Sequence, residues 1–251
     1  MTIFYFTGTG NSLAVAKRIG GNLVSIPQIV DEKNLHYKDD VIGVVFPIYA
    51  LIAPQMVRQF LDKVKFEADY IFAIGTYGNS AGSAMRTLQK QAQKNGYSYN
   101  YLDSVLMVDN CLPIFEIGAE IAKIPQKKTD ENITRIVKNI QSRKQNQATA
   151  SLAHRAVSFA VSKLLTYNKF AQKYIINSDC NKCGICAKVC PAKNVKVGEK
   201  IQFGENCAGC QSCLHLCPQN AIHLKNEKST QRWRNPDVSL DEIVKANNRG
   251  K

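Results

Sequence analysis

The sequence is short of acidic residues and of long apolar runs. It has 20 Asp and Glu against 33 Lys and Arg, which gives a formal net charge of +13. The longest apolar run, Val41–Pro54, is interrupted by Pro47 and is shorter than the roughly 20 residues that a membrane-spanning helix needs. The first residues lack the basic start and small-residue cleavage site of a signal peptide. We therefore expect a cytoplasmic protein without a transmembrane segment.

The excess of basic residues is concentrated between positions 123 and 176, where 11 Lys and Arg face only 2 Asp and Glu. Two basic helices, 129–147 and 152–174, are predicted there. The second has an apolar stripe that includes Val157, Val161, Leu164 and Leu165. This stripe packs on the body of the protein, or it docks on a membrane surface or a partner. Neither helix has a short face of Arg, Asn and Gln that would read bases, so nucleic acid is not expected.

Apolar segments in the first 110 residues alternate between strand-like and helix-like patterns. Strands are predicted at 2–6, 22–26, 41–46, 71–75 and 101–108, and helices at 12–19, 54–63 and 81–94. The segment 41–46 is continuously apolar, as is typical of a strand buried on both faces. The alternation predicts an α/β fold, with a doubly wound parallel sheet and helices on both faces. Ligands of such sheets bind beyond the carboxyl ends of the strands.

A hydroxyl-rich turn, Thr7-Gly8-Thr9-Gly10-Asn11-Ser12, follows the first predicted strand and opens the first predicted helix. Hydroxyls and exposed N–H groups at a helix N-terminus suit a phosphate dianion. The turn lacks the Lys-Ser/Thr pair of a P-loop and the spacing of G-x-G-x-x-G. A simple helix cap is the alternative interpretation.

Two further loops follow the third and fourth predicted strands, Pro47-Ile48-Tyr49-Ala50 and Thr76-Tyr77-Gly78-Asn79-Ser80-Ala81-Gly82. Asp109-Asn110 follows the fifth. Because the carboxyl ends of parallel strands meet at one edge, we expect these loops to line one crevice with the hydroxyl-rich turn. Taken alone, Tyr49 and Tyr77 are explained equally well by ordinary packing or surface exposure.

Together the three loops resemble the flavin-binding loops of flavodoxins, over residues 1 to about 145. The first resembles the phosphate loop S/T-x-T-G-x-T/S, and the other two occupy the places of the loops that contact the isoalloxazine ring. The resemblance implies a flavodoxin-like five-stranded sheet of order 2-1-3-4-5 and a bound FMN. Residues 113–145 depart from a flavodoxin ending. The implied FMN-binding residues are Thr7, Gly8, Thr9, Gly10, Asn11, Ser12, Pro47, Ile48, Tyr49, Ala50, Thr76, Tyr77, Gly78, Asn79, Ala81 and Gly82.

Eight of the nine cysteines lie between positions 180 and 217, in two runs of the form C-x₂-C-x₂-C-x₃-C-P. Three thiolates spaced in this way wrap one cubane, and the fourth, followed by proline, leads away and ligates the other cluster. One [4Fe–4S] cluster is therefore assigned to Cys180, Cys183, Cys186 and Cys217. The other is assigned to Cys207, Cys210, Cys213 and Cys190.

Other uses of these cysteines fit less well. Zinc ribbons usually pair C-x₂-C units across a longer gap, and disulfides need an oxidising compartment. Clustered free cysteines imply a reducing, anaerobic habitat. The module resembles bacterial two-cluster ferredoxins over about 45 residues, although those are usually acidic and this one is slightly basic. Cys111, far from both runs, is expected to be a small buried residue.

The combination resembles the EFR1 family of flavodoxin–ferredoxin fusion proteins. It divides the chain into a flavodoxin-like domain (1–147), a basic helical linker (148–177), a two-cluster domain (178–225) and a C-terminal extension (226–251), which we expect to pack through Trp233. The expected function is one-electron transfer between two [4Fe–4S] clusters and FMN, as a carrier or an oxidoreductase. No general acid or base stands out, and Tyr49 and Tyr77 are the candidates nearest to a bound acceptor.

The expected partner is a redox protein, such as an acidic ferredoxin or a flavoenzyme, or a small-molecule acceptor. A peripheral contact with a membrane stays open. The alternative function is a redox-sensing or scaffold protein that docks an acidic partner through its basic helices.

Overall fold

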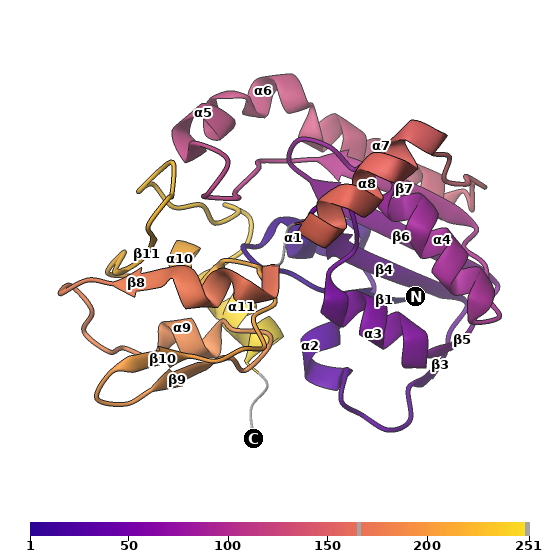
Figure 1. Ribbon diagram of the computed structural model, residues 1–251. Helices are drawn as coiled ribbons and strands as arrows, with labels where there is room; N and C mark the ends of the chain where they lie inside the picture. The colour runs from indigo at the N-terminus through magenta and orange to yellow at the C-terminus, as the bar shows by residue number, and fades with distance from the viewer. Residues whose placement is uncertain (165–166, 249–251) are drawn as a thin grey trace.

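The structure is a computed structural model that describes residues 1–164 and 167–248 (Figure 1). A parallel sheet covered by helices forms one part, and a small module of short helices and strand pairs lies beside it. Throughout these described residues, no helix combines the length and apolar character needed to cross a membrane.

Five strands form the main sheet in the order β2-β1-β4-β6-β7, and every neighbouring pair is parallel. They are β1 (Thr2–Tyr5), β2 (Asn22–Ser25), β4 (Val41–Pro47), β6 (Tyr70–Tyr77) and β7 (Tyr101–Leu106). The doubly wound sheet and its predicted order 2-1-3-4-5 are confirmed. The continuously apolar β4 lies third in the order, buried on both faces, which is why its side chains do not alternate in polarity.

Helices cover both faces of this sheet. On one face lie α1 (Asn11–Ile19) and α7 (Thr129–Gln141), and on the other α2 (Ile26–Ile29), α3 (Gln55–Lys63) and α4 (Ala84–Lys94). A two-stranded parallel pair, β3 (His36–Lys38) and β5 (Lys65–Glu67), was not predicted, because three-residue strands carry too little periodicity.

The basic middle segment differs from its prediction. Between β7 and α7 lie two short helices, α5 (Ile117–Ala122) and α6 (Ile124–Lys127). The predicted helix 129–147 ends early, because Arg143 adopts a left-handed conformation and Asn146 then pairs with Tyr101 at the sheet edge.

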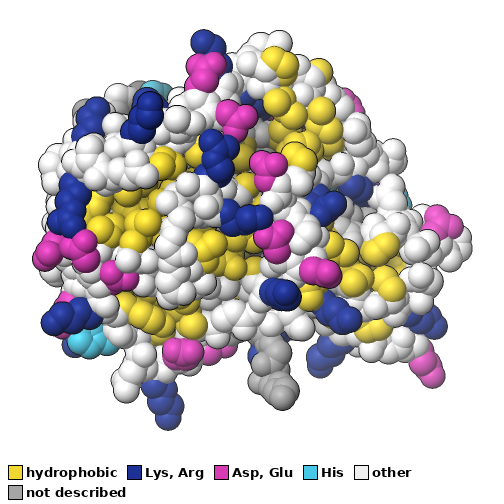
Figure 2. All heavy atoms as spheres, turned by 180° about the vertical axis from the view of Figure 1, so that it is seen from behind, with side chains coloured by type: hydrophobic (Ala, Val, Ile, Leu, Met, Phe, Trp, Pro, Cys, Tyr) yellow, Lys and Arg dark blue, Asp and Glu magenta, His cyan; other side chains and the backbone are white. Residues whose placement is uncertain are grey.

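The predicted single helix 152–174 is wrong. It is replaced by α8 (Leu152–Leu164) and the 3₁₀ helix η1 (Tyr167–Lys173), after which the chain extends into a strand. In the predicted apolar stripe, Val157 is exposed and Val161 is half-buried. The side chain of Leu164 and all of Leu165 lie outside what the structure describes. Figure 2 shows one face of the molecule, on which Lys and Arg side chains are interspersed with Asp and Glu rather than gathered in one patch.

The cysteine-rich module consists of two antiparallel strand pairs and two short helices. The strand pairs are β8 (Tyr174–Ile176) with β11 (Ile222–Leu224), and β9 (Val195–Val197) with β10 (Ile201–Phe203). The helices are α9 (Ile185–Lys188) and α10 (Ser212–His215). Because β8 pairs with β11, the strand pairs of this module include residues that precede position 178, which the sequence indicated as the start of the two-cluster domain.

The C-terminal extension joins the two parts of the molecule. Trp233 is only 9% exposed, so it packs as expected. The helix α11 (Leu240–Asn247) follows, opened by a capping box between Ser239 and Glu242. Its Ile243 enters the core on the α1 and α7 face of the sheet, together with Val189 of the cysteine module.

Candidate functional site

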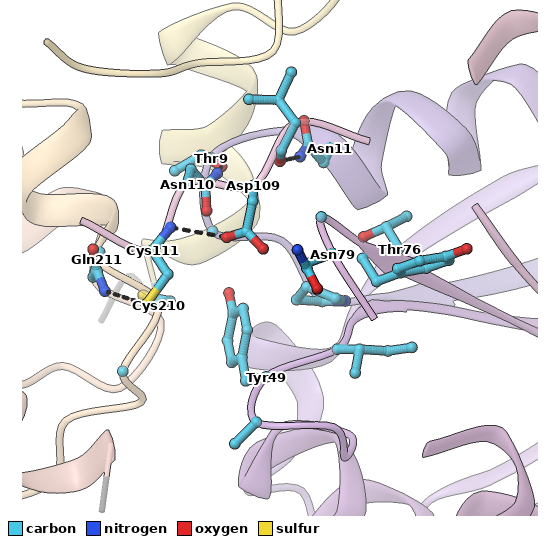
Figure 3. Close-up of a pocket in the computed structure, with 18 of the residues that line it drawn as sticks. Thr9, Asn11, Tyr49, Thr76, Asn79, Asp109, Asn110, Cys111, Cys210 and Gln211 are labelled. Atoms are coloured by element: carbon cyan, nitrogen blue, oxygen red, sulfur yellow. Dashed lines mark hydrogen bonds between the residues drawn. The ribbon is translucent and has the colours of Figure 1, made fainter. Parts of the chain in front are cut away.

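A cavity of about 250 Å³ lies at the carboxyl ends of the sheet strands (Figure 3). All three predicted loops contribute to its lining. They supply Thr7, Gly8, Thr9, Asn11, Ser12, Pro47, Ile48, Tyr49, Ala50, Thr76, Tyr77, Gly78 and Asn79. Of the remaining predicted residues, Gly10, Ala81 and Gly82 lie in the same loops but outside this lining. Asp109 and Asn110 line the cavity as well.

The hydroxyl-rich turn is fixed by side-chain hydrogen bonds to the neighbouring loops. The hydroxyls of Ser12 and Thr76 lie 2.8 Å apart and share a hydrogen bond, and Asn110 donates from Nδ2 to Oγ1 of Thr9. Gly10, at φ +104°, precedes α1, whose first turn contains no acidic side chain. The positive end of the helix dipole is therefore available to an anion at this turn.

The turn is closely approached at Gly8, where a side chain would crowd the neighbouring atoms. A Cβ atom added at Gly8 would lie 3.0 Å from Oη of Tyr49 and 3.1 Å from the carbonyl oxygen of Cys210. The neighbouring hydroxyl-bearing residues Thr7 and Ser12 are buried and line the same cavity. The donor set therefore fits the phosphate end of a flavin nucleotide.

The loop after β4 is a tight turn with backbone strain. Ala50 and Leu51 both have positive φ, at 47° and 66°, a conformation that costs free energy for non-glycine residues. Tyr49 and Ile52 hold the turn through two backbone hydrogen bonds of 2.9 and 3.1 Å. The strained turn presents the Tyr49 side chain to the cavity, where a planar ring could stack on it (Figure 3).

A buried lysine that the sequence did not indicate donates hydrogen bonds to the loop after β6. Lys127 is 7% exposed and donates from Nζ to the carbonyl oxygens of Gly78 (2.9 Å) and Met107 (2.7 Å). It also forms an ion pair of 2.9 Å with Glu120. Burial alone would raise the pKa of the Glu120 carboxyl, but hydrogen bonds from Lys123 and Lys127 hold this pKa below its usual value.

Two further polar groups of the cavity lie on the segment after β7. Burial raises the pKa of the Asp109 carboxyl, whose Oδ1 accepts the N–H of Cys111 at 3.1 Å. Burial also raises the pKa of the Cys111 thiol to about 12, and the charge of Asp109 adds to this effect. Cys111 was expected only as a small buried residue, but it is half-buried and lines the cavity.

The thiols of the two cysteine runs lie close enough to act on one another. The thiols that act on Cys186 are those of Cys217, Cys183 and Cys180, although burial is the main reason that its pKa rises to about 11. Burial likewise dominates the raised pKa of Cys213, with contributions from Cys210, Cys190, Cys207 and Cys186. In both cases the neighbouring thiols include the fourth cysteine of the other run, which is the arrangement that the predicted crossed ligation requires.

The two runs also share a backbone pattern. Residues at equivalent positions have positive φ in both runs, as in the pairs Lys182 and Gly209, and Gly184 and Gln211. The fourth cysteines, Cys190 and Cys217, each accept an N–H at 3.3 Å from the residue four positions later. Such N–H···S bonds tune the potential of a bound cluster.

No group of three His, Cys, Asp or Glu side chains in the described ranges 1–164 and 167–248 is arranged to hold a metal ion. The cysteines of a cubane each bind a different iron atom, so the thiols of one set do not need to meet at a single point.

The cavity is also lined by residues of the cysteine module, namely Gly209, Cys210 and Gln211. Sequence reasoning did not place these residues near the flavin loops, because no local pattern reports which repeat of a symmetric module faces the neighbouring domain.

Comparisons with known proteins assign both parts. Residues 3–112 match the family model for Flavodoxin, and residues 173–195 match that for the 4Fe-4S binding domain. No curated protein matches the chain.

Solved structures with a similar fold include flavodoxin-type proteins. Two-electron reduced flavodoxin from Megasphaera elsdenii is 19% identical, with a TM-score of 0.32, over 41% of this chain and 84% of that chain. A structure from Bacteroides uniformis described as a flavoprotein is 18% identical, with a TM-score of 0.33, over 42% of this chain and 89% of that chain. The chain thus joins a flavodoxin-like domain to a ferredoxin-like 4Fe–4S domain, and this fusion has an electron-transfer role.

Proposed function

We propose that the chain is a flavo-iron–sulfur protein of the EFR1 family that holds one FMN and two [4Fe–4S] clusters and serves as a carrier or a reductase. The observation that carries the proposal is the shared wall of the two sites. Cys210 and Gln211 of the second cysteine run line the same cavity as Thr7 and Tyr49 of the flavodoxin-like domain. Adjacent cofactor sites are what intramolecular electron transfer requires.

The chain's own residues supply position and shielding. The hydroxyls of Thr7, Thr9 and Ser12 and the N-terminus of α1 would hold the phosphate, and Tyr49 and Tyr77 would flank the ring. When bound, FMN accepts and releases one or two electrons and each cluster one. Burial raises the pKa of Tyr77, so this phenol stays neutral and adds no charge beside the ring.

Three apolar side chains, Ile114, Phe115 and Val161, also line the cavity, and Ile114 is 52% exposed. An electron acceptor that enters the cavity beside Ile114 would therefore meet an apolar side chain. The proposal places the protein in a reducing cytoplasm, because the thiols of both sets must stay free to hold iron.

Anaerobic purification followed by analysis of iron, sulfide and FMN tests this function. We expect about eight irons and one FMN per chain, from two cubanes and one crevice. Reduction of the clusters should be followed by bleaching of the flavin absorbance.

A matched pair of variants ties the flavin to the cavity. Gly8→Val would crowd both Tyr49 and the cluster ligand Cys210, so it should abolish FMN binding and remove at most the roughly four irons of one cluster. Gly198→Ala is the control, because its added Cβ would come no nearer than 4.0 Å to another atom. Zinc in place of iron, or no FMN in the wild-type protein, would refute the proposal.

The second candidate function is docking of an acidic partner through the basic middle segment. It is favoured by the exposed side chain of Arg155 on α8, beside the apolar side chains of Val157 and Phe159, which are 54% and 67% exposed. Salt-sensitive binding of a partner by protein that contains no flavin would support it instead.

A further inference from the structure

The two cysteine runs have equivalent spacing but very different surroundings. In the first run, Lys182, Cys183 and Lys188 are exposed. Their counterparts in the second run are Gly209, Cys210 and His215, of which Gly209 and His215 are buried and Cys210 is half-buried. A symmetric module has therefore been placed asymmetrically, with the second run turned inward.

The inward-facing run is bonded directly to the flavin crevice. Ser212 donates from Oγ to the carbonyl oxygen of Gly8 at 2.9 Å. The backbone N–H of Leu112 donates to Oε1 of Gln211 at 3.0 Å. His215 donates from Nε2 to the carbonyl oxygen of Asn110 at 2.8 Å. These bonds reach the loops after β1 and β7, so the second run forms part of the crevice itself.

Cys210 is the cluster ligand at this contact. It lines the cavity, and its Cβ atom lies 3.3 Å from the place that a Cβ of Gly8 would occupy (Figure 3). Its thiol belongs to the set that contains Cys190, Cys207 and Cys213. In the described part of the chain, no residue of the first run, from Cys180 to Cys190, lines the cavity.

We propose that the cluster of Cys190, Cys207, Cys210 and Cys213 is the one that exchanges electrons with the flavin, and that the cluster of Cys180, Cys183, Cys186 and Cys217 is the outer port for an acidic one-electron carrier protein. This inference rests on the proposed function. One electron would pass from the reduced carrier to the outer cluster, from there to the inner cluster, and finally to the flavin. The carrier is oxidised by one electron, the flavin is reduced by one, and no covalent bond is made or broken.

The charge at the outer port favours an acidic carrier, because the two exposed lysines of this run, Lys182 and Lys188, outnumber the one exposed acidic residue beside it, Asp179. Lys182 lies directly before the exposed Cys183, and Lys188 lies on α9 of the same run. Both side chains are exposed, so their charges are presented to solvent. Complementary charge accelerates the encounter of proteins and makes its rate sensitive to salt.

The order of the clusters is tested with two matched variants, Cys210→Ser and Cys183→Ser, which remove one thiolate at equivalent positions of the two runs. The readout is the microwave power at which the flavin EPR signal saturates in partly reduced protein, since a nearby paramagnetic cluster speeds its relaxation. We expect Cys210→Ser to lose this enhancement and Cys183→Ser to retain it.

Crossed ligation supplies a second pair in case Cys210→Ser fails to fold. Cys190→Ser should behave as Cys210→Ser does, although Cys190 lies in the first run, and Cys217→Ser should behave as Cys183→Ser does. Loss of the enhancement in Cys183→Ser, or equal behaviour of all variants, would overturn the order. Absence of iron or FMN from wild-type protein would refute the proposed function itself and is measured first.

The port is tested with the double variant Lys182→Glu with Lys188→Glu, reduced by a purified acidic two-cluster ferredoxin at low salt. We expect flavin reduction to slow at least tenfold, and the defect to shrink as salt is added. Reduction by a small viologen should change less than twofold. Lys90→Glu with Lys94→Glu on α4 is the control, and an equal loss in this control would overturn the assignment of the port.

Discussion

Replacement of Lys127 by methionine is the most direct test of how this fold supports its cavity. The ammonium group of Lys127 donates to the carbonyl oxygens of Gly78 and Met107 and pairs with Glu120, and both charged side chains are almost completely buried. Methionine keeps the apolar stem but removes all three interactions. The loop that carries Gly78 forms one wall of the cavity.

The size of the effect follows from burial. Removal of one partner of a buried ion pair costs about 3–5 kcal/mol. Glu120 keeps a contact of 2.6 Å with Lys123, so we expect the lower limit, about 3 kcal/mol. This corresponds to an increase of about 150-fold in the local opening equilibrium. If the loop must close before FMN binds, the FMN affinity falls by at most that factor, and by less if the closed loop still predominates in the variant.

Hydrogen exchange of the segment 76–82 and fluorescence titration with FMN measure the two consequences separately. Lys123→Met is the matched control, because Lys123 contacts the same carboxylate but its side chain is 57% exposed. Lys123→Met should lower the free energy of local opening of the loop by at most about 1 kcal/mol. If hydrogen exchange of the segment 76–82 is equal in the two variants within twofold, Lys127 does not hold the loop and the reasoning is refuted.

Three further predictions concern the packing around the cavity. Gly78→Ala would place a Cβ 2.2 Å from that of Asp109, so we expect loss of FMN binding, measured by titration, with iron content unchanged. Ser239→Ala removes the capping box of α11 and should lower protection of this helix from hydrogen exchange by about 1 kcal/mol. A hydrogen bond from Lys17, followed by those from Ser239, lowers the pKa of Glu242 to about 2. The ionised Glu242 carboxylate therefore stabilises α11 fully above about pH 4.5, and this stabilisation is lost as the pH falls towards 2. The difference in hydrogen-exchange protection of α11 between wild type and Glu242→Gln should shrink over this range.

The main sheet could be predicted because its strands are buried on both faces. A run such as Val41–Pro47 has to be apolar throughout, and the polar turns between such runs mark where the strands end. Since parallel strands end at one edge, the loops at Thr7, Tyr49 and Thr76 could be assigned to one crevice from the sequence alone. The cysteine spacing was informative for a similar reason, because wrapping a cubane dictates the distances along the chain.

Other features depend on contacts between distant segments and leave no local pattern. Lys127 and Glu120 meet across two short helices, and neither position differs in sequence from an exposed charged residue. The 3₁₀ helix η1 and the strand β8 were missed because the pairing of β8 with the distant β11 leaves no pattern in this segment. The helix α11 did have a local signal, the capping box of Ser239 and Glu242.

The C-terminal extension explains how two cofactor sites can keep a fixed separation. Asn247 donates from Nδ2 to the carbonyl oxygens of Thr7 (3.0 Å) and Val189 (3.2 Å), and so connects the hydroxyl-rich turn to the cysteine module. The N–H of Asn235 donates to the carbonyl oxygen of Thr9 at 2.9 Å. A flexible tether would bring the sites together only part of the time. Because this extension is built into the core of both parts, the short path between them is a property of the folded chain and does not depend on a docking event.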